Sequence, residues 1–276
     1  MRTRTVGQGT VINVGMTDME PLNMKINSEH PSNGEEYSVD ATPELPANSL
    51  TGKTIYWLGS SVTFGFAACG EAVPDYMAKR NGLTSVKSTI SGTTLAHVAY
   101  SDEVGSPWQV RVANGMPAEV CEQLAPLSYL ARLEDFPKDG KPDLVVIQLS
   151  TNDSQFPAKY QGIIADGFDE ADFDGATTFG ATQLILARVK KYWGCPVLIY
   201  TSPLLFVDTY KSMVEATRTI ADKWGAHLLD MNADEAFNEL GQAHMEEWMN
   251  DPVHPKRRGY IEWWTPRFEE AIRELV

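Results

Sequence analysis

The chain has 276 residues, of which 43% are hydrophobic and 10% aromatic, and its net charge is −14 from 37 acidic and 23 basic residues. This apolar content is sufficient for a buried core, and no run approaches the ~18 apolar residues of a membrane-spanning helix. A surface this negative repels phosphate backbones and anionic lipid headgroups, so nucleic acid and membranes are excluded as expected partners. Neutral small molecules, such as sugars, are the more expected ligands of such a surface.

The beginning of the chain and its cysteines predict where the protein resides. No apolar segment follows Arg2 and Arg4, so no signal peptide is visible. Three cysteines, far apart in the sequence, argue against a disulfide framework. We therefore expect a soluble cytoplasmic protein, unless a leader has been removed. A homo-oligomer is left open.

Residues 1–50 differ in composition from the rest of the chain. They are rich in Asn, Pro, Ser, Glu and Gly, and only 10–14 resembles a strand. We expect a mostly extended N-terminal arm that lies on a domain formed by residues 51–276. An arm that covers the substrate or forms a dimer is the alternative.

From residue 53 onward, strand patterns alternate with helix patterns. Short apolar runs predict strands at 54–58, 85–90, 143–149, 196–201 and 226–230, and apolar periodicity predicts helices at 73–80, 181–193, 209–224 and 256–275. This alternation predicts a three-layer α/β/α sandwich around a mostly parallel sheet of about five strands. Residues 101–142 are a long insertion with a predicted helix around 118–133, and 154–180 form a long loop.

Polar residues follow three of the predicted strands, at the sheet edge where such folds bind ligands. Ser60 and Ser61 follow the first strand, Gly92 the second and Asn152 the third. Either serine is a candidate nucleophile, because a strand-to-helix turn exposes a hydroxyl. The Asn152 amide and the Gly92 N–H are candidate donors to an oxyanion. The structural alternatives are a helix cap, an Asx turn and an ordinary glycine turn.

A candidate base lies near the C-terminus, in Asp251-Pro-Val-His254. A carboxylate three residues before an imidazole, on a short turn, can reach Nδ1 and leave Nε2 to accept a serine proton. Pro252 and Pro255 stiffen this turn. The alternative is a loop that leads into a helix, with Asp251 as its cap and His254 as an unrelated surface residue.

Taken together and in order, these segments resemble the blocks of the SGNH/GDSL hydrolase family. Gly59-Ser-Ser-Val-Thr63 resembles block I, usually Gly-Asp-Ser-[Leu/Ile]-Thr, and Gly92 is similar to the block II glycine. Asn152 resembles the block III asparagine, and Asp251-Pro-Val-His254 the block V motif. The resemblance covers about residues 53–276 and implies the flavodoxin-like fold of that family.

The same resemblance implies a serine esterase with a covalent acyl-enzyme. Its catalytic triad would be Ser61, Asp251 and His254, and its oxyanion hole would be formed by Ser61, Gly92 and Asn152. No metal or organic cofactor is implied. We expect a small-molecule ester as substrate, with a short acyl group such as acetyl on a carbohydrate. A lysophospholipase or thioesterase, and a non-catalytic binding module of the same fold, are the alternatives.

Two residues depart from the family pattern. Ser60 replaces the usual Asp of block I, as in family members of the Gly-Ser-Ser type. Ser150 replaces the usual glycine of block III, where a side chain would narrow the pocket or tilt Asn152. Residues 170–175 superficially resemble a calcium loop, but Ala181 stands where its bidentate acid is required.

Overall fold

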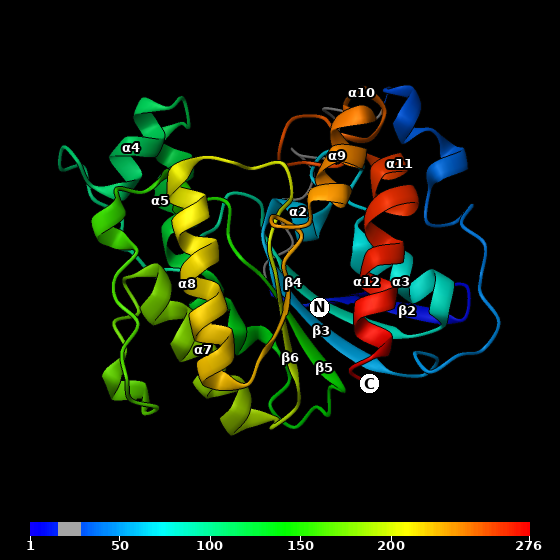
Figure 1. Cartoon of the computed structure of the whole chain (residues 1–276), viewed down its shortest axis with the longest axis horizontal. Coiled ribbons are helices and arrows are strands. Elements are labelled where there is room, and N and C mark those ends of the chain that lie inside the picture. The colour runs from blue at the N-terminus through cyan, green and yellow to red at the C-terminus, as the bar shows by residue number, and fades with distance from the viewer. Residues whose placement is uncertain (16–28) are drawn as a thin grey trace.

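Seven strands form one sheet, in the order β1-β2-β4-β3-β5-β6-β7 (Figure 1). They are β1 (Arg2–Val6), β2 (Gly9–Asn13), β3 (Thr54–Gly59), β4 (Thr84–Thr89), β5 (Leu144–Gln148), β6 (Val197–Tyr200) and β7 (His227–Leu229). Neighbouring strands are parallel except for the antiparallel pair β1 and β2. This computed structural model describes residues 1–15 and 29–276.

The predicted fold class is confirmed, and the strand count is corrected from five to seven. The five predicted strands correspond to β3 through β7. The additional strands form a hairpin in which β2 pairs with β4 and so extends the sheet. Four of the five side chains of β1 are exposed, so this strand lacks the apolar run by which the others were predicted. The segment 1–50 thus begins with two strands of the sheet, and it also contains short helices at Pro31–Asn33 and Glu35–Tyr37. A domain boundary at residue 50 stays a prediction.

Helices cover both faces of the sheet (Figure 1). α7 (Thr178–Tyr192) and α8 (Asp208–Trp224) lie on one face, and α3 (Val73–Asn81) and α12 (Thr265–Arg273) lie on the other. The other α-helices of the described residues are α2 (Ser61–Phe64), α4 (Pro107–Ala113), α5 (Ala118–Leu124), α6 (Tyr129–Arg132), α9 (Glu235–Ala243), α10 (Met245–Trp248) and α11 (Arg257–Gly259). No helix within the described ranges is long and apolar enough to cross a membrane.

Two of the predicted helices are interrupted. The helix predicted around 118–133 is divided into α5 and α6 by a 3-10 turn at Ala125–Leu127, where Pro126 has no N–H to continue the α-helical hydrogen bonds. The helix predicted at 256–275 consists of α11, a π-helix at Tyr260–Trp264 and α12. The π-helical turn adds a residue to the local repeat and so changes the direction of the side chains that follow.

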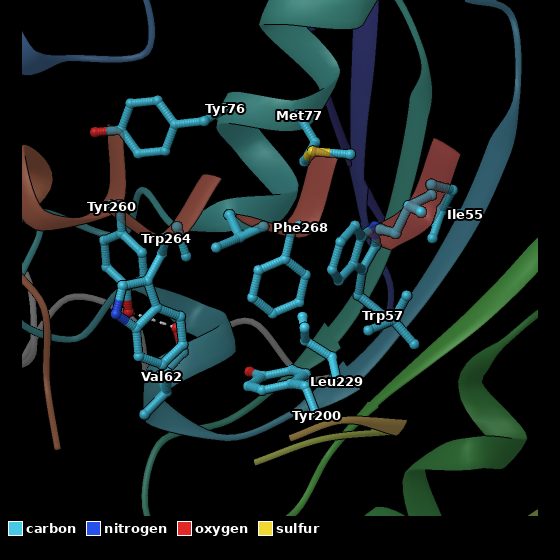
Figure 2. Close-up of a cluster of buried hydrophobic side chains, with 14 of the residues drawn as sticks. Ile55, Trp57, Val62, Tyr76, Met77, Tyr200, Leu229, Tyr260, Trp264 and Phe268 are labelled. Atoms are coloured by element: carbon cyan, nitrogen blue, oxygen red, sulfur yellow. Dashed lines mark hydrogen bonds between the residues drawn. The ribbon is translucent and has the colours of Figure 1, made fainter. Parts of the chain in front are cut away.

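Alternate residues of β3 pack against the two helical layers. Tyr56 and Leu58 belong to the cluster under α7 and α8, whereas Ile55 and Trp57 belong to the cluster under α3 and α12. Figure 2 shows the second cluster, in which Phe268 lies 6.1 Å from the Trp57 ring. Because β3 is buried on both faces, its carboxyl end is held rigidly at the place where the chain turns into α2.

The order of the parallel strands locates the place where a ligand crevice forms. β3 lies between β4 and β5, so the chain leaves β3 toward one side of the sheet and later returns to the other side. In doubly wound sheets the loops separate at this point and open a crevice at the carboxyl ends of the strands. The loops after β3, β4 and β5 carry the polar residues singled out in the sequence.

Candidate active site

The turn after β3 brings one serine hydroxyl against a histidine. Ser61 is the first residue of α2, and its Oγ lies 2.9 Å from Nε2 of His254. Ser60 is fully buried, and its hydroxyl accepts a 3.3 Å hydrogen bond from the Asn152 amide. Of the two serines that the sequence left open, Ser61 is therefore the one in contact with the imidazole.

Buried polar side chains from neighbouring strands hold this turn. Gln148, the last residue of β5, accepts hydrogen bonds from the Ser60 N–H at 3.0 Å and from the Thr63 hydroxyl at 2.8 Å. The Thr63 hydroxyl also lies 2.7 Å from the Tyr200 hydroxyl at the end of β6. The Tyr260 hydroxyl donates to the Val62 carbonyl at 2.6 Å (Figure 2).

The histidine is held by a carboxylate on its other ring nitrogen. Nδ1 of His254 lies 2.9 Å from Oδ2 and 3.0 Å from Oδ1 of Asp251. The same Oδ1 accepts the backbone N–H groups of Val253 and His254, at 2.8 and 3.1 Å. The carboxylate therefore fixes both the turn and the imidazole, with Nδ1 as the donor and Nε2 directed at Ser61. On the ring face, Phe66 lies 5.1 Å from the imidazole centroid.

Asp251 remains ionised in this setting. Burial alone would raise its pKa, but hydrogen bonds from His254, Asn250 and the Val253 N–H together hold the pKa of this carboxyl well below its usual range. An ionised carboxylate stabilises an imidazolium on its neighbour, which is the charged form that a histidine adopts after it accepts a proton.

Asn152 lies at the start of the loop after β5, with both ends of its amide in hydrogen bonds. Its Nδ2 donates to the Thr93 carbonyl at 2.9 Å, in addition to the longer bond to Ser60. Its backbone N–H donates at 3.2 Å to the Ser150 hydroxyl, which also accepts from the Asp153 N–H at 3.4 Å. The serine that departs from the family pattern thus bonds backbone groups of its own loop, and its hydroxyl is fully buried below Asn152.

Gly92 adopts a backbone conformation that favours glycine. Its φ is +81°, and a Cβ added there would lie 2.8 Å from Cδ1 of Leu124. The sequence offered this glycine as a candidate N–H donor, and the structure adds the left-handed conformation and the contact with α5. Among residues 1–15 and 29–276, neither the Gly92 N–H nor the Ser61 N–H has a hydrogen-bond acceptor. Both therefore remain available to a ligand.

A pocket of about 320 Å³ adjoins the histidine. His254 and Asn152 both line it. Its other walls mix polar and apolar side chains, namely Thr151, Ser154, Gln155, Thr209, Leu205, Val207 and Val253.

Two supporting residues were not singled out in the sequence. Gln148 closes a strand that is otherwise apolar, Leu-Val-Val-Ile, so the single polar residue at its end was a usable signal. Arg111 in α4 donates to the Gly92 carbonyl at 2.6 Å and to Oδ1 of Asn152 at 3.2 Å. Nothing in the local sequence of α4 distinguishes this arginine from a surface residue.

A hydroxyl, an imidazole and a carboxylate in series, at the carboxyl edge of a doubly wound sheet, form the arrangement used by serine hydrolases. The chain belongs to the GDSL-like lipase/acylhydrolase family, whose model matches residues 57–260, and it is a carboxylic ester hydrolase. The family resemblance seen in the sequence is thereby confirmed.

Solved structures share the fold at low sequence identity. A protein from Lactobacillus plantarum is 17% identical, with a TM-score of 0.55, over 82% of this chain and 99% of its own. A candidate GDSL-like lipase from Bacteroides ovatus ATCC 8483 is 14% identical, with a TM-score of 0.55, over 81% of this chain and 99% of its own. Another from Bacteroides uniformis ATCC 8492 is 14% identical, with a TM-score of 0.52, over 81% and 96%. A comparison with curated proteins finds no match.

Proposed function

We propose that this chain is a serine esterase that removes short acyl groups, acetyl above all, from a hydroxylated small molecule such as a carbohydrate. One observation carries the proposal: Ser61 Oγ lies 2.9 Å from His254 Nε2, and Asp251 Oδ2 lies 2.9 Å from the Nδ1 of the same ring. These distances permit proton transfer from the hydroxyl to the ring, without any rearrangement of the three side chains.

In the proposed reaction, Ser61 Oγ attacks the ester carbonyl carbon while its proton passes to His254. The oxyanion of the tetrahedral intermediate accepts hydrogen bonds from the Ser61 and Gly92 N–H groups and from the Asn152 amide, which gives up its 3.3 Å bond to Ser60. As the intermediate collapses, the leaving alcohol takes the proton from His254 and an acyl-serine remains. Water then attacks the acyl carbon, gives a proton to His254, and releases the acid as Ser61 recovers its proton. Asp251 stabilises the imidazolium in both steps.

The lining of the pocket beside His254 is compatible with a compact, partly polar substrate. Thr151, Ser154 and Gln155 supply hydroxyl and amide groups to its lining, and Leu205 and Val253 supply apolar contacts. A pyranose ring presents hydroxyls at its edge and C–H groups on its faces, so it matches both kinds of wall. The net charge of −14 favours a neutral ligand over an anionic lipid headgroup.

A second candidate is an ester with a longer acyl chain, as in a lysophospholipase or thioesterase. It is favoured by one observation, the exposed apolar pair Phe206 and Val207, 42% and 48% exposed, with Val207 on the pocket wall. A panel of p-nitrophenyl esters from acetate to palmitate separates the two. A kcat/KM that falls steadily with chain length supports the short-acyl enzyme, and a maximum at eight carbons or more supports the second candidate.

The decisive test compares two adjacent serines. Ser61→Ala should abolish hydrolysis of p-nitrophenyl acetate and labelling by a fluorophosphonate probe, because no nucleophile remains. Ser60→Ala, the matched control, should keep both, with a modest loss from its missing bond to Asn152. If Ser61→Ala keeps near-normal turnover, the assignment is wrong. If the unaltered chain neither hydrolyses esters nor reacts with the probe, the binding-module alternative is favoured.

A further inference from the structure

We infer that Arg111 is a positioning residue for the oxyanion site, and that it sets the direction of the Asn152 amide and the course of the Gly92 loop. The inference rests on the proposed function. Arg111 belongs to α4, within the insertion 101–142 that separates β4 from β5. The insertion therefore contributes to the chemistry of a site that otherwise arises from the strand ends of the sheet.

The guanidinium joins the two loops that carry the proposed donors. Nη1 donates to the Gly92 carbonyl at 2.6 Å, in the loop after β4. Nη2 donates to Oδ1 of Asn152 at 3.2 Å, in the loop after β5. A guanidinium holds both acceptors in one plane because its N–H groups form a rigid fork. Its own position is fixed from behind by Trp108, whose ring centroid lies 5.3 Å from Cζ and whose indole N–H donates to the Val98 carbonyl.

This contact and the Thr93 carbonyl together decide which end of the amide faces the nucleophile. An asparagine side chain carries an oxygen and a nitrogen of nearly the same size, so its orientation follows from its partners. Arg111 has only donors, so it must face Oδ1 of Asn152, and Nδ2 then points toward Ser60 and Thr93. With the opposite orientation the amide oxygen would face the developing oxyanion and repel it. Arg111 holds the oxygen end and Thr93 the nitrogen end, so the two together make Asn152 present a donor.

The charge of Arg111 adds to this effect. The side chain is 1% exposed, and in the described part of the chain it forms no ion pair: both of its acceptors are neutral. Burial lowers its pKa, and Cys121 and Asp153 partly oppose that shift, but an arginine stays protonated in a protein. The Asp153 carboxylate is occupied by the N–H groups of Leu95 and Ala96, at 2.8 and 3.1 Å. A buried cation without a direct counter-ion favours negative charge nearby, and that charge forms on the substrate oxygen only during the reaction.

A second arginine of the insertion supports the same loops from below. Arg132 is fully buried in α6, and it donates to the Gly59 carbonyl at 2.8 Å and to the Thr93 hydroxyl at 2.9 Å. Thr93 in turn accepts from Nδ2 of Asn152 through its carbonyl. The insertion therefore reaches the nucleophile turn and the oxyanion loops through two buried cations, of which only Arg111 contacts the proposed donors.

The test uses three variants of the full-length chain: Arg111→Gln, Arg111→Lys and the control Arg188→Gln. Arg188 lies on α7 and pairs with Glu170 and Glu134, so its replacement should leave kinetics unchanged. Arg111→Gln should lower kcat on p-nitrophenyl acetate by about 10-fold or more and change KM less than threefold, because the loss falls on the transition state. Affinity for a small alkylboronic acid, which forms a tetrahedral adduct with the serine, should fall by a similar factor.

Arg111→Lys keeps the charge but not the fork, so it should recover part of the kcat and of the boronate affinity if the variants are folded. A merely structural role would lower thermal stability without a selective loss of boronate affinity, and that result would overturn the inference. So would a kcat within threefold of the unaltered protein in both Arg111 variants while Ser61→Ala is inactive. An active Ser61→Ala variant would instead refute the proposed function, whatever the Arg111 variants do.

Discussion

The exchange Asp251→Asn isolates the role of the carboxylate with little change in shape. Oδ1 accepts the Val253 and His254 backbone N–H groups at 2.8 and 3.1 Å. Only an oxygen can replace it there, so the asparagine amide must keep its oxygen in that place. Its NH2 group then takes the place of Oδ2, 2.9 Å from Nδ1 of His254. A donor at this position favours Nδ1 as the acceptor, with the ring proton on Nε2, over the tautomer in which Nδ1 donates to the remaining oxygen at 3.0 Å.

The consequence is a histidine that cannot accept the proton of Ser61. Its Nε2, 2.9 Å from Ser61 Oγ, would carry a proton of its own, and the imidazolium would lose its counter-charge. In a serine protease, the equivalent exchange lowers kcat by about 10⁴-fold, which corresponds to roughly 5 kcal/mol at 25 °C. We expect a loss of this order, with KM little changed. The assay is steady-state hydrolysis of p-nitrophenyl acetate, with the reactive fraction titrated by a fluorophosphonate.

Asn250→Ala provides the matched control, since it removes one donor to Oδ2, at 2.9 Å, and leaves the carboxylate in place. It should cost less than tenfold in kcat. The reasoning would be refuted if Asp251→Asn lost less than tenfold while Ser61→Ala was inactive, because the carboxylate would then not govern the tautomer of His254.

Acid titration of stability gives a separate check on Asp251. Its pKa in the folded protein is held below its ordinary value of 3.8, so ionisation stabilises the fold at neutral pH. This contribution is complete above the unfolded pKa and is lost as pH falls through the folded one. Urea unfolding of the unaltered protein and Asp251→Asn should therefore show a stability difference at pH 7 that narrows below about pH 4.

Three further outcomes are expected. The rate should rise with pH as His254 loses its proton, since only neutral imidazole acts as a base, and a profile flat from about pH 5 to 9, with chemistry rate-limiting, would contradict this. Asn152→Ala should lower kcat by about 10²–10³-fold with little change in KM, whereas Ser150→Gly should be mild, and the reverse pattern would make the Ser150 hydroxyl the donor. Gly92→Ala should destabilise the protein by about 1–3 kcal/mol in urea unfolding, because alanine disfavours a φ of +81° and its Cβ would lie 2.8 Å from Leu124. An unchanged urea midpoint would show that the loop around Gly92 shifts to accommodate the methyl group.

Strands β3 to β6 could be predicted because most of their residues are buried. β5 has every side chain buried and reads Leu-Val-Val-Ile-Gln, so its apolar run identified it without any knowledge of its neighbours. The candidate site residues could be proposed for a related reason: Ser61, Gly92 and Asn152 each follow such a strand, and parallel strands direct their carboxyl ends to one edge. The local sequence alone could not decide between Ser60 and Ser61, because that choice depends on the position of His254 in the fold.

The features that were missed depend on partners distant in the sequence. β1 reads Arg-Thr-Arg-Thr-Val, and it forms a strand because β2 lies beside it rather than because it buries an apolar face. Arg111 is separated by 41 residues from Asn152, and its burial follows from the way α4 folds onto the loops. A charged residue in a short helix is normally expected to be exposed to solvent, and only the assembled fold shows that Arg111 is buried.

The hairpin of β1 and β2 also changes which strand forms the outer edge of the sheet, where another chain could pair. β4 pairs with β2 on one side from Thr84 to Lys87, and with β3 on the other. Without β2, this inner strand would become a free edge whose unpaired N–H and C=O groups can accept a strand from another chain. With the hairpin in place, the outermost strand is β1, which carries Arg2 and Arg4. Cationic side chains on a short edge strand disfavour strand addition, so we expect β1 to make the outer edge of the sheet a poor template for pairing with another chain.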